Sequence, residues 1–223
     1  MKLGAQLYTV RNFLKTPEDF DKTLAKIKEI GYNYVQVSGA FDYDAKWLDD
    51  ALKRHNLTCP LTHTAPDKII GATEKVISDH KTFGCKYVGL GGMSLEMREE
   101  NDPAALFYDD FANAIKSLKA AGLKFMYHNH AFEFIRKNGE MIIDGICDRF
   151  SPDELGVTLD TYWVQAAGCD PVYWIEKLKG RLNCVHLKDM RANYKNESLM
   201  APIYEGNLNF DAIIEACEMA GTE

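Results

Sequence analysis

Residues 120–127 read AAGLKFMY, in which a glycine separates the end of a helical pattern from a short apolar run. The same unit of helix end, glycine and strand start occurs as EIGY at residues 29–32 and as TFGC at residues 82–85. Glycine readily takes the left-handed conformation that ends a helix. The repetition predicts strands that alternate with helices, and therefore parallel strands joined by right-handed crossovers.

The alternation extends over the whole chain. The short runs are rich in β-branched and aromatic residues, which favours strands. These runs lie at residues 3–8, 34–37, 58–62, 87–90, 124–127, 156–159 and 182–187. Longer periodic patterns predict helices at residues 17–30, 45–55, 67–83, 103–121, 171–178 and 210–220. The first helix is preceded by Thr16, an N-cap residue, and begins with Pro17, which suits the first helical position.

Two architectures fit this pattern, an open doubly wound sheet and a closed (β/α)₈ barrel. A doubly wound nucleotide-binding sheet normally carries a glycine-rich fingerprint after its first strand, and residues 6–11 (QLYTVR) contain no glycine. The glycine cluster GLGG at residues 89–92 follows the fourth strand, as a weak phosphate cradle or as a tight turn. The barrel is therefore favoured.

A barrel of this kind typically needs about 250 residues and eight strands, whereas only seven strands are predicted here in 223 residues. We therefore interpret residues 1–223 as a single barrel domain that lacks its eighth strand and helix, and we expect the natural chain to continue past Glu223.

Composition narrows the function classes. Hydrophobic residues make up 46% and charged residues 26%, as in a folded globular protein. The net charge of −7 argues against a general nucleic-acid or membrane binder. Six scattered cysteines without a C-x-x-C pair, and no signal peptide, indicate a reduced, cytoplasmic protein. A small-molecule substrate is thus the expected partner, and a homo-oligomer is compatible with the sequence.

In a barrel, the active site lies where the strands end, and polar residues gather at those predicted positions. His63 follows the third strand, and His128, His130 and Glu133 follow the fifth. Asp160 ends the sixth strand, while His186 and Lys188 end the seventh. Two further histidines, His55 and His80, fall near helix ends, where we expect them to be solvated.

Imidazole and carboxylate groups together bind divalent ions such as Zn²⁺, Mn²⁺ or Co²⁺. A metal at this edge would polarise a sugar carbonyl and stabilise an enediolate. Each residue also has a structural alternative: Asp160 as a loop cap, His186 as a hydrogen-bonded strand residue, Glu133 as a solvated loop residue, and Lys188 with Asp189 as an exposed ion pair. Three aromatic residues either stack on a sugar or pack: Tyr127, Phe132 and Trp163.

Five segments carry a resemblance to a known family: LGAQLYTVR at residues 3–11, HNHAFEF at 128–134, VTLDT at 157–161, VHLKD at 185–189 and YEGNLNF at 204–210. With them the chain resembles the sugar phosphate isomerase/epimerase superfamily, the xylose isomerase-like TIM barrels. The resemblance covers nearly the whole chain. It does not specify the substrate, because the superfamily includes isomerases, epimerases, dehydratases of inosose and dehydroshikimate, enzymes acting on 3-keto sugars, and endonuclease IV.

The resemblance implies one divalent metal ion (Mn, Zn, Co or Mg) held by residues near strands 5 to 8. Carried over, it implies Glu133, Asp160 and His186 as metal ligands, with His128 as a further ligand or a proton carrier. A strand-8 glutamate of the family has no counterpart in this sequence. His63, His128 and Lys188 are the residues that would orient or protonate the enediolate.

The first functional interpretation is a metal-dependent isomerase or epimerase of a sugar or keto-sugar. The alternative is a lyase on the same scaffold, either a dehydratase or an enzyme that eliminates from 3-keto glycosides. A repair nuclease like endonuclease IV needs more metal ligands and a basic groove, which the net charge disfavours. A non-catalytic binding barrel, which would hold no metal, is the remaining interpretation.

Overall fold

The computed structural model describes residues 1–223, which divide into two compact units. The N-terminal unit comprises Lys2–Gly91 and Asn113–Phe125, and the C-terminal unit comprises Met1, Gly92–Ala112 and Met126–Glu223. Helix α6 (Pro103–Ala120) and strand β5 (Lys124–His128) each begin in one unit and end in the other.

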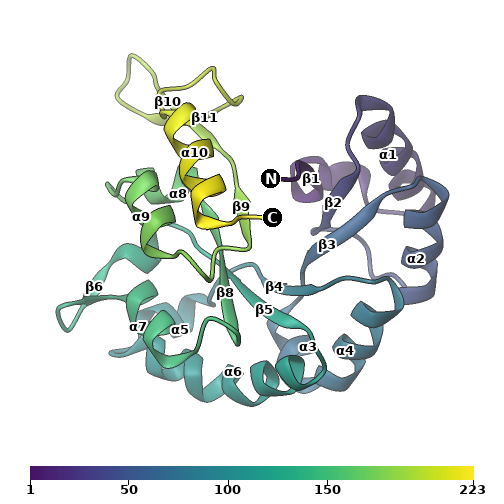
Figure 1. Ribbon diagram of the computed structural model, residues 1–223, viewed down its shortest axis with the longest axis horizontal. Helices are drawn as coiled ribbons and strands as arrows, with labels where there is room; N and C mark the ends of the chain where they lie inside the picture. The colour runs from purple at the N-terminus through teal and green to yellow at the C-terminus, as the bar shows by residue number, and fades with distance from the viewer. The chain divides into compact units, whose positions relative to one another are not determined.

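The N-terminal unit carries parallel strands in sequence order, with each strand paired to the next. They are β1 (Gly4–Gln6), β2 (Tyr34–Val37), β3 (Thr58–His63) and β4 (Tyr87–Leu90). The connecting helices are η1 (Leu7–Phe13, a 3₁₀ helix), α1 (Pro17–Ile30), α2 (Ala45–Arg54), α3 (Pro66–Gly71) and α4 (Thr73–Thr82). Helices α1 and α2 lie beside the strands on their outer side (Figure 1).

Helix α1 shows how local sequence sets the element boundaries. The Thr16 hydroxyl accepts a hydrogen bond from the Asp19 amide (3.2 Å), and Pro17 opens the first turn. Gly31 ends the helix at φ +115°, a conformation that L side chains rarely adopt. Phe20, Leu24 and Ile27 form the buried stripe that packs onto the strands. The predicted helix 17–30 is confirmed at both ends.

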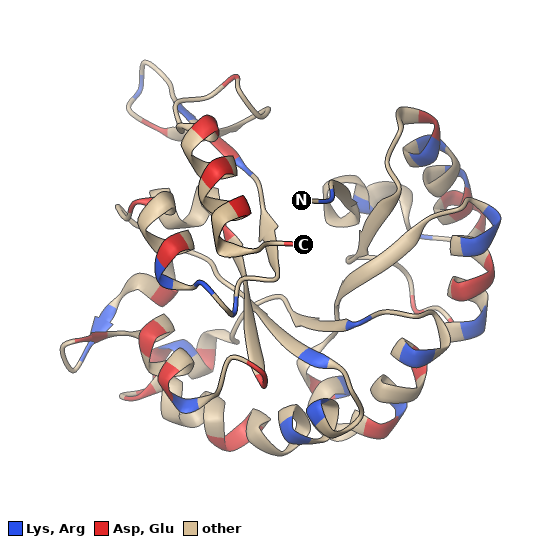
Figure 2. Ribbon diagram, in the orientation of Figure 1, with Lys and Arg blue, Asp and Glu red and all other residues tan.

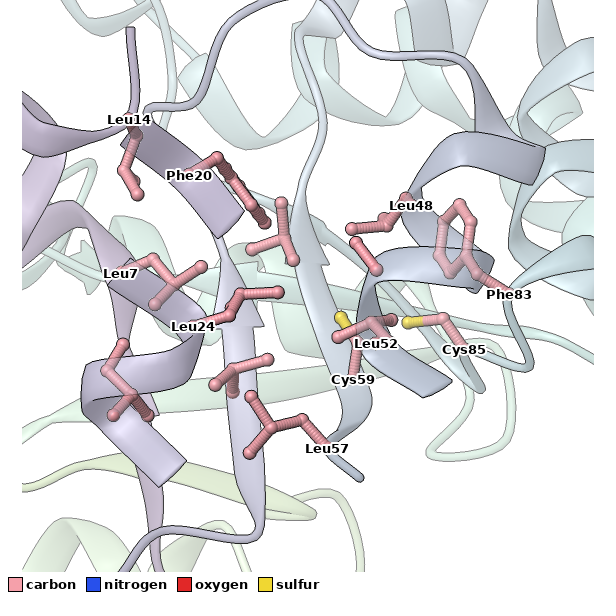
Figure 3. Packing of buried hydrophobic residues seen from close by; sticks show 14 of the residues in the cluster. Leu7, Leu14, Phe20, Leu24, Leu48, Leu52, Leu57, Cys59, Phe83 and Cys85 are labelled. Carbon is pink, nitrogen blue, oxygen red and sulfur yellow. The ribbon is translucent and has the colours of Figure 1, made fainter. Parts of the chain in front are cut away.

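The core of the N-terminal unit lies between its helices and its strands (Figure 3). Phe20 and Leu24 of α1 and Leu48 of α2 are fully buried in the same cluster as Cys59 of β3. Phe20 also makes an edge-to-face contact with Trp47 (ring centroids 5.4 Å apart). All six cysteines of the chain are free thiols, and Cys59 and Cys85 are buried as small apolar groups.

The C-terminal unit holds the remaining parallel strands in the order β5, β8 (Leu155–Asp160) and β9 (Cys184–His186). Two hairpins interrupt the alternation: β6 (Arg136–Lys137) with β7 (Glu140–Met141), and β10 (Asp189–Ala192) with β11 (Ser198–Ala201). The helices are α5 (Leu95–Glu99), η2 (Phe132–Phe134), α7 (Ile142–Arg149), α8 (Thr161–Ala166), α9 (Pro171–Lys177) and α10 (Phe210–Ala220). Charged residues lie mostly on helices and loops, while the strands carry few (Figure 2).

The predicted α/β fold is confirmed, since all seven predicted strands belong to the parallel sheet. Two of the differences in boundaries have a local cause. Predicted strand 3–8 ends at Gln6, because the Gln6 side chain accepts a hydrogen bond from the Tyr8 amide and starts the 3₁₀ helix η1. Predicted helix 67–83 divides into α3 and α4 at Ala72, whose φ of −139° is not helical.

The expectation that His80 is solvated was wrong. Its side chain in α4 is buried, with Nδ1 2.8 Å from the Val76 carbonyl and Nε2 2.8 Å from the Thr62 hydroxyl. His55 is half-buried beside Asp21. The cluster GLGG includes Gly89, where an added Cβ would lie 2.2 Å from the Thr62 carbonyl oxygen. This glycine therefore allows β4 to lie close to β3.

Candidate metal centre

Three polar residues meet where strands of the C-terminal unit end. His128 is the last residue of β5, Asp160 the last of β8 and His186 the last of β9. Asp160 and His186 are register partners in the parallel β8–β9 pair, so both strands end at the same level. One donor atom from each of His128, Asp160 and His186 lies within 4.8 Å of the other two. The three residues form a compact donor set.

The two oxygens of the Asp160 carboxylate have different partners. Oδ1 accepts a hydrogen bond from the Trp163 amide (3.3 Å) and caps helix α8. Oδ2 lies 3.3 Å from His128 Nε2 and 3.7 Å from His186 Nδ1. The Asp160 amide in turn donates to the Asn129 side chain (2.9 Å). The carboxylate is therefore both the helix cap that the sequence allowed and a member of the donor set.

A cation already lies at this carboxylate. Lys188 Nζ is 2.8 Å from Asp160 Oδ2, and Lys188 also lies over the Trp163 ring at 5.9 Å. The exposed ion pair of Lys188 with Asp189 is not present. Asp189 is instead buried and accepts hydrogen bonds from the amides of Gly206 (2.9 Å) and Leu208 (3.2 Å).

The electrostatic environment favours a negative Asp160 carboxylate beside a neutral His186 imidazole. Burial raises the pKa of Asp160, but hydrogen bonds from His128 and His186 and the charge of Lys188 outweigh it, so this pKa lies well below the ordinary value. Burial lowers the pKa of His186 to about 4, although Asp160 opposes the shift. At neutral pH, Asp160 is ionised and the His186 imidazole is neutral.

These donors fit a divalent metal ion. Two imidazoles and one carboxylate are ligands that Zn²⁺, Co²⁺ and Mn²⁺ share. The Asp160 side chain is fully buried, and the ammonium of Lys188 shows that its Oδ2 accepts a cation. The same atom faces both imidazoles, so the donor set and its charge are compatible with a divalent metal ion.

Glu133 is buried in η2 and is not one of these three donors. Its Oε1 accepts a hydrogen bond from the Tyr127 hydroxyl and its Oε2 accepts one from the His130 amide, each at 2.7 Å. Burial raises its pKa to about 7, against these hydrogen bonds. Its assignment as a ligand stays a prediction, and the structure groups His128 with Asp160 and His186.

Aromatic side chains adjoin the donor set on one side. His130 stacks on Phe132 (ring centroids 5.9 Å apart), and Trp163 lies 5.4 Å from His130. The Arg98 guanidinium covers Phe132 at 3.8 Å. Tyr127 is fully buried, so of the three aromatic residues considered from the sequence it is the one that packs.

Residues 24–222 of this chain match the family described as the xylose isomerase-like TIM barrel. This chain belongs to that family. The candidate donor set of the C-terminal unit therefore lies at strand ends of a TIM-barrel-type fold, where such barrels place their active sites.

Among curated relatives of this xylose isomerase-like chain, inosose dehydratase of Mesomycoplasma hyopneumoniae (strain 7448) is 27% identical over 199 residues. That match covers 80% of this chain and 65% of the relative. Inosose dehydratase of Geobacillus kaustophilus (strain HTA426) is 25% identical, and that match covers 77% of this chain and 62% of the relative. The chain thus spans a little less than two thirds of the length of these relatives.

Solved structures support the fold. A sugar phosphate isomerase/epimerase from Parabacteroides distasonis ATCC 8503 superposes with a TM-score of 0.81 at 23% identity, covering 100% of this chain and 88% of that chain. The probable 3-DHS dehydratase involved in petrobactin synthesis from Bacillus anthracis superposes with a TM-score of 0.69 at 14% identity, covering 100% and 90%. No helix of the xylose isomerase-like chain has the length and apolar character needed to cross a membrane.

Two further residues are not members of the donor set: His63, which the sequence predicted as a site residue, and Thr161, which it did not. His63 ends β3 in the N-terminal unit, where its Nδ1 lies 3.3 Å from the Ser38 hydroxyl, and its catalytic role stays a prediction. Thr161 was missed by the sequence analysis. Its buried hydroxyl accepts a hydrogen bond from the Lys188 amide (2.9 Å) and lies 2.7 Å from the Lys188 carbonyl oxygen. The only signal in the sequence was its position directly after Asp160.

Proposed function

We propose that this protein is a divalent-metal-dependent lyase that removes water from a small polyhydroxylated ketone of the inosose type. The observation that carries the proposal is the buried group of His128, Asp160 and His186 with Lys188 beside it. The relatives named inosose dehydratase support elimination as the outcome. The proposal therefore follows the lyase alternative rather than the isomerase interpretation.

His128, Asp160 and His186 would hold the metal ion. A divalent cation bound by them would polarise the substrate carbonyl and stabilise the enediolate that forms when the neighbouring C–H bond breaks. The low pKa of Asp160 keeps its carboxylate charged, and the lowered pKa of His186 keeps its imidazole available as a ligand at neutral pH. We extend the same proposal to Mn²⁺, Zn²⁺, Co²⁺ and Mg²⁺. A structural neighbour is described with a bound zinc atom.

The chain's own residues would act on the substrate around that point. The Lys188 ammonium, about one third exposed, would donate a hydrogen bond to the developing oxyanion. Trp163 and Phe132 would cover one side of the substrate and exclude water. In the elimination, the proton leaves the carbon next to the carbonyl, a C=C bond forms, and the hydroxyl on the following carbon departs as water.

An isomerase or epimerase of a sugar or keto-sugar is the second candidate, because the same residues serve its first step. The two reactions differ only in the fate of the enediolate, which is either reprotonated or loses its β-hydroxyl. A positive charge beside the donor set stabilises the shared enediolate. The proposed substrate class is a small polyol ketone, and a phosphate group is not assumed.

A panel of inososes and keto-sugars in D₂O tests the proposal with added Mn²⁺, Zn²⁺, Co²⁺ or Mg²⁺. The lyase yields an unsaturated ketone that absorbs in the ultraviolet, and the reaction stops when a chelator is added. Deuterium incorporation or epimer formation without the unsaturated product would instead establish the isomerase. Absence of both reactions together with absence of bound metal would leave the non-catalytic binding barrel, whereas absence of both reactions with metal bound would reject this substrate class.

A further inference from the structure

The atom that a metal ion would need is already in use. Asp160 Oδ2 is the carboxylate oxygen that faces His128 and His186, and Lys188 Nζ lies 2.8 Å from that same oxygen. The other oxygen, Oδ1, is engaged in capping helix α8. An incoming cation and the ammonium of Lys188 therefore depend on one oxygen atom.

The backbone of Lys188 is held by hydrogen bonds, whereas its side chain is partly exposed. The Thr161 hydroxyl bonds to both the amide and the carbonyl of Lys188, so the main chain stays in place beside helix α8. The Lys188 side chain is 32% exposed, while that of Asp160 is completely buried. The long lysine side chain thus has a path away from the carboxylate, and the Trp163 ring 5.9 Å away attracts a cation along it.

We propose that Lys188 is a built-in competitor for the metal ion. In the metal-free protein its ammonium neutralises the buried Asp160 carboxylate, which would otherwise carry an uncompensated charge. A divalent cation must displace this ammonium, and the displaced Lys188 then turns toward the substrate. The inference rests on the proposed function, since it assumes that His128, Asp160 and His186 hold the metal.

Removal of a competing side chain should change the metal affinity in the opposite direction to removal of a metal ligand. Removing a residue that supports metal binding weakens it, whereas removing a competitor strengthens it. Lys188→Met deletes the charge and keeps most of the length of the side chain, and Lys188→Arg keeps the charge. Lys177→Met is the matched control in the same unit, because Lys177 also pairs with an aspartate, Asp144 (2.6 Å), and lies over a tryptophan, Trp174 (4.3 Å).

Titration of the metal-free proteins with Zn²⁺ and with Mn²⁺ by calorimetry measures the effect. We expect Lys188→Met to bind at least about tenfold more tightly than wild type, since one like charge no longer opposes the ion. Lys188→Arg and Lys177→Met should bind like the wild type. Equal or weaker binding by Lys188→Met overturns the inference, as does equal tightening by Lys177→Met, which would show an effect of net charge.

The same titrations distinguish failure of the proposed metal centre from failure of the proposed competition by Lys188. If neither wild type nor Lys188→Met binds either metal, the metal centre and the competition are both rejected. If both bind with the same affinity, only the competition is rejected.

A measurement on the wild type covers the case in which Lys188→Met does not fold. An amine-acylating reagent followed by mass spectrometry reports whether the Lys188 ammonium is engaged. We expect labelling of Lys188 to rise several-fold when Zn²⁺ or Mn²⁺ is added, while labelling of Lys177 stays constant. Unchanged or reduced labelling of Lys188 in metal-saturated protein would contradict its displacement.

Discussion

His80 and the group around Asp160 are two buried polar regions built on opposite principles. His80 has one partner for each ring nitrogen, the Val76 carbonyl and the Thr62 hydroxyl, and no charged group within hydrogen-bond reach. Burial lowers its pKa, so it stays neutral. At Asp160 Oδ2, in contrast, two imidazoles and an ammonium crowd a single buried carboxylate oxygen.

The difference shows how a structural histidine is told apart from a functional one. A neutral imidazole donates through one nitrogen and accepts through the other, and the pair of bonds at His80 uses both capacities. Both ring nitrogens of His80 therefore already have a partner within the protein. At Asp160 Oδ2, by contrast, two imidazoles and an ammonium share one carboxylate oxygen, and such a concentration of titratable groups is typical of functional sites.

We expect the largest effect on metal affinity and turnover from a substitution within the group of His128, Asp160 and His186. Asp160→Asn removes the charge but keeps the ability to cap α8, so we expect a folded protein whose metal affinity and turnover are at least about 100-fold lower. Calorimetry and the dehydration assay measure the two losses. Asp170→Asn, at the cap of α9 (2.9 Å to the Val172 amide), is the matched control and should retain both properties. Metal binding by Asp160→Asn at wild-type strength would exclude Asp160 as a ligand.

Glu133 shares a feature with each of these regions. Like His80, it has a hydrogen-bond partner for each polar atom of its side chain, and like Asp160 it is a buried carboxyl group whose charge burial opposes. Its pKa rises from 4.5 in the unfolded chain to about 7 in the folded protein. The folded state therefore binds the proton more tightly, and the stabilisation is complete below about pH 4.5 and lost as the pH rises to about 7. The expected change is about 3 kcal/mol, at 1.36 kcal/mol per pKa unit.

Denaturant unfolding of the metal-free protein at pH 5 and pH 8 checks this effect. The free-energy difference between wild type and Glu133→Gln isolates it, because histidines such as His130 and His186 titrate in both proteins. We expect that difference to fall with pH. A constant difference would mean that Glu133 is ionised throughout.

At His80 we expect a loss of stability without a loss of metal binding. His80→Leu leaves the Val76 carbonyl without its side-chain partner and should cost about 1–3 kcal/mol of unfolding free energy. His55→Leu, which removes a half-buried pair with Asp21, should cost less than about 1 kcal/mol. Chemical denaturation measures both. A change in metal affinity in His80→Leu would weaken the distinction between the two regions.

The smallest effect is expected at Thr161, which holds the Lys188 backbone without contacting a metal ion or substrate. Thr161→Val keeps the shape and removes the hydroxyl, whereas Thr161→Ser keeps the hydroxyl. We expect Thr161→Val to lower kcat by about fivefold, equivalent to one hydrogen bond of about 1 kcal/mol, with KM little changed. Thr161→Ser should restore the rate. Equal losses in both variants would attribute the effect to packing.

Much of the fold was predictable because its signals are local. Thr16, Pro17 and Gly31 delimit α1 through their own backbone preferences, and the strands were located by short apolar runs. Helices α5, α7 and α8 and the two hairpins escaped prediction, since such short elements carry little periodicity. His80 was misjudged because its partner Thr62 lies on another element.

For the candidate site, the sequence determined which residues stand at strand ends, because parallel strands place their carboxyl ends at one edge: His128, Asp160, His186 and Lys188. Tertiary structure alone decided which of them share an atom. The choice of His128 beside Asp160, the placement of Lys188 on Oδ2 and the engagement of Glu133 by Tyr127 all depend on side-chain distances of about one ångström more or less. The distances of His128 and Lys188 from Asp160 arise from packing between residues more than 25 positions apart in the chain, and no local pattern encodes them.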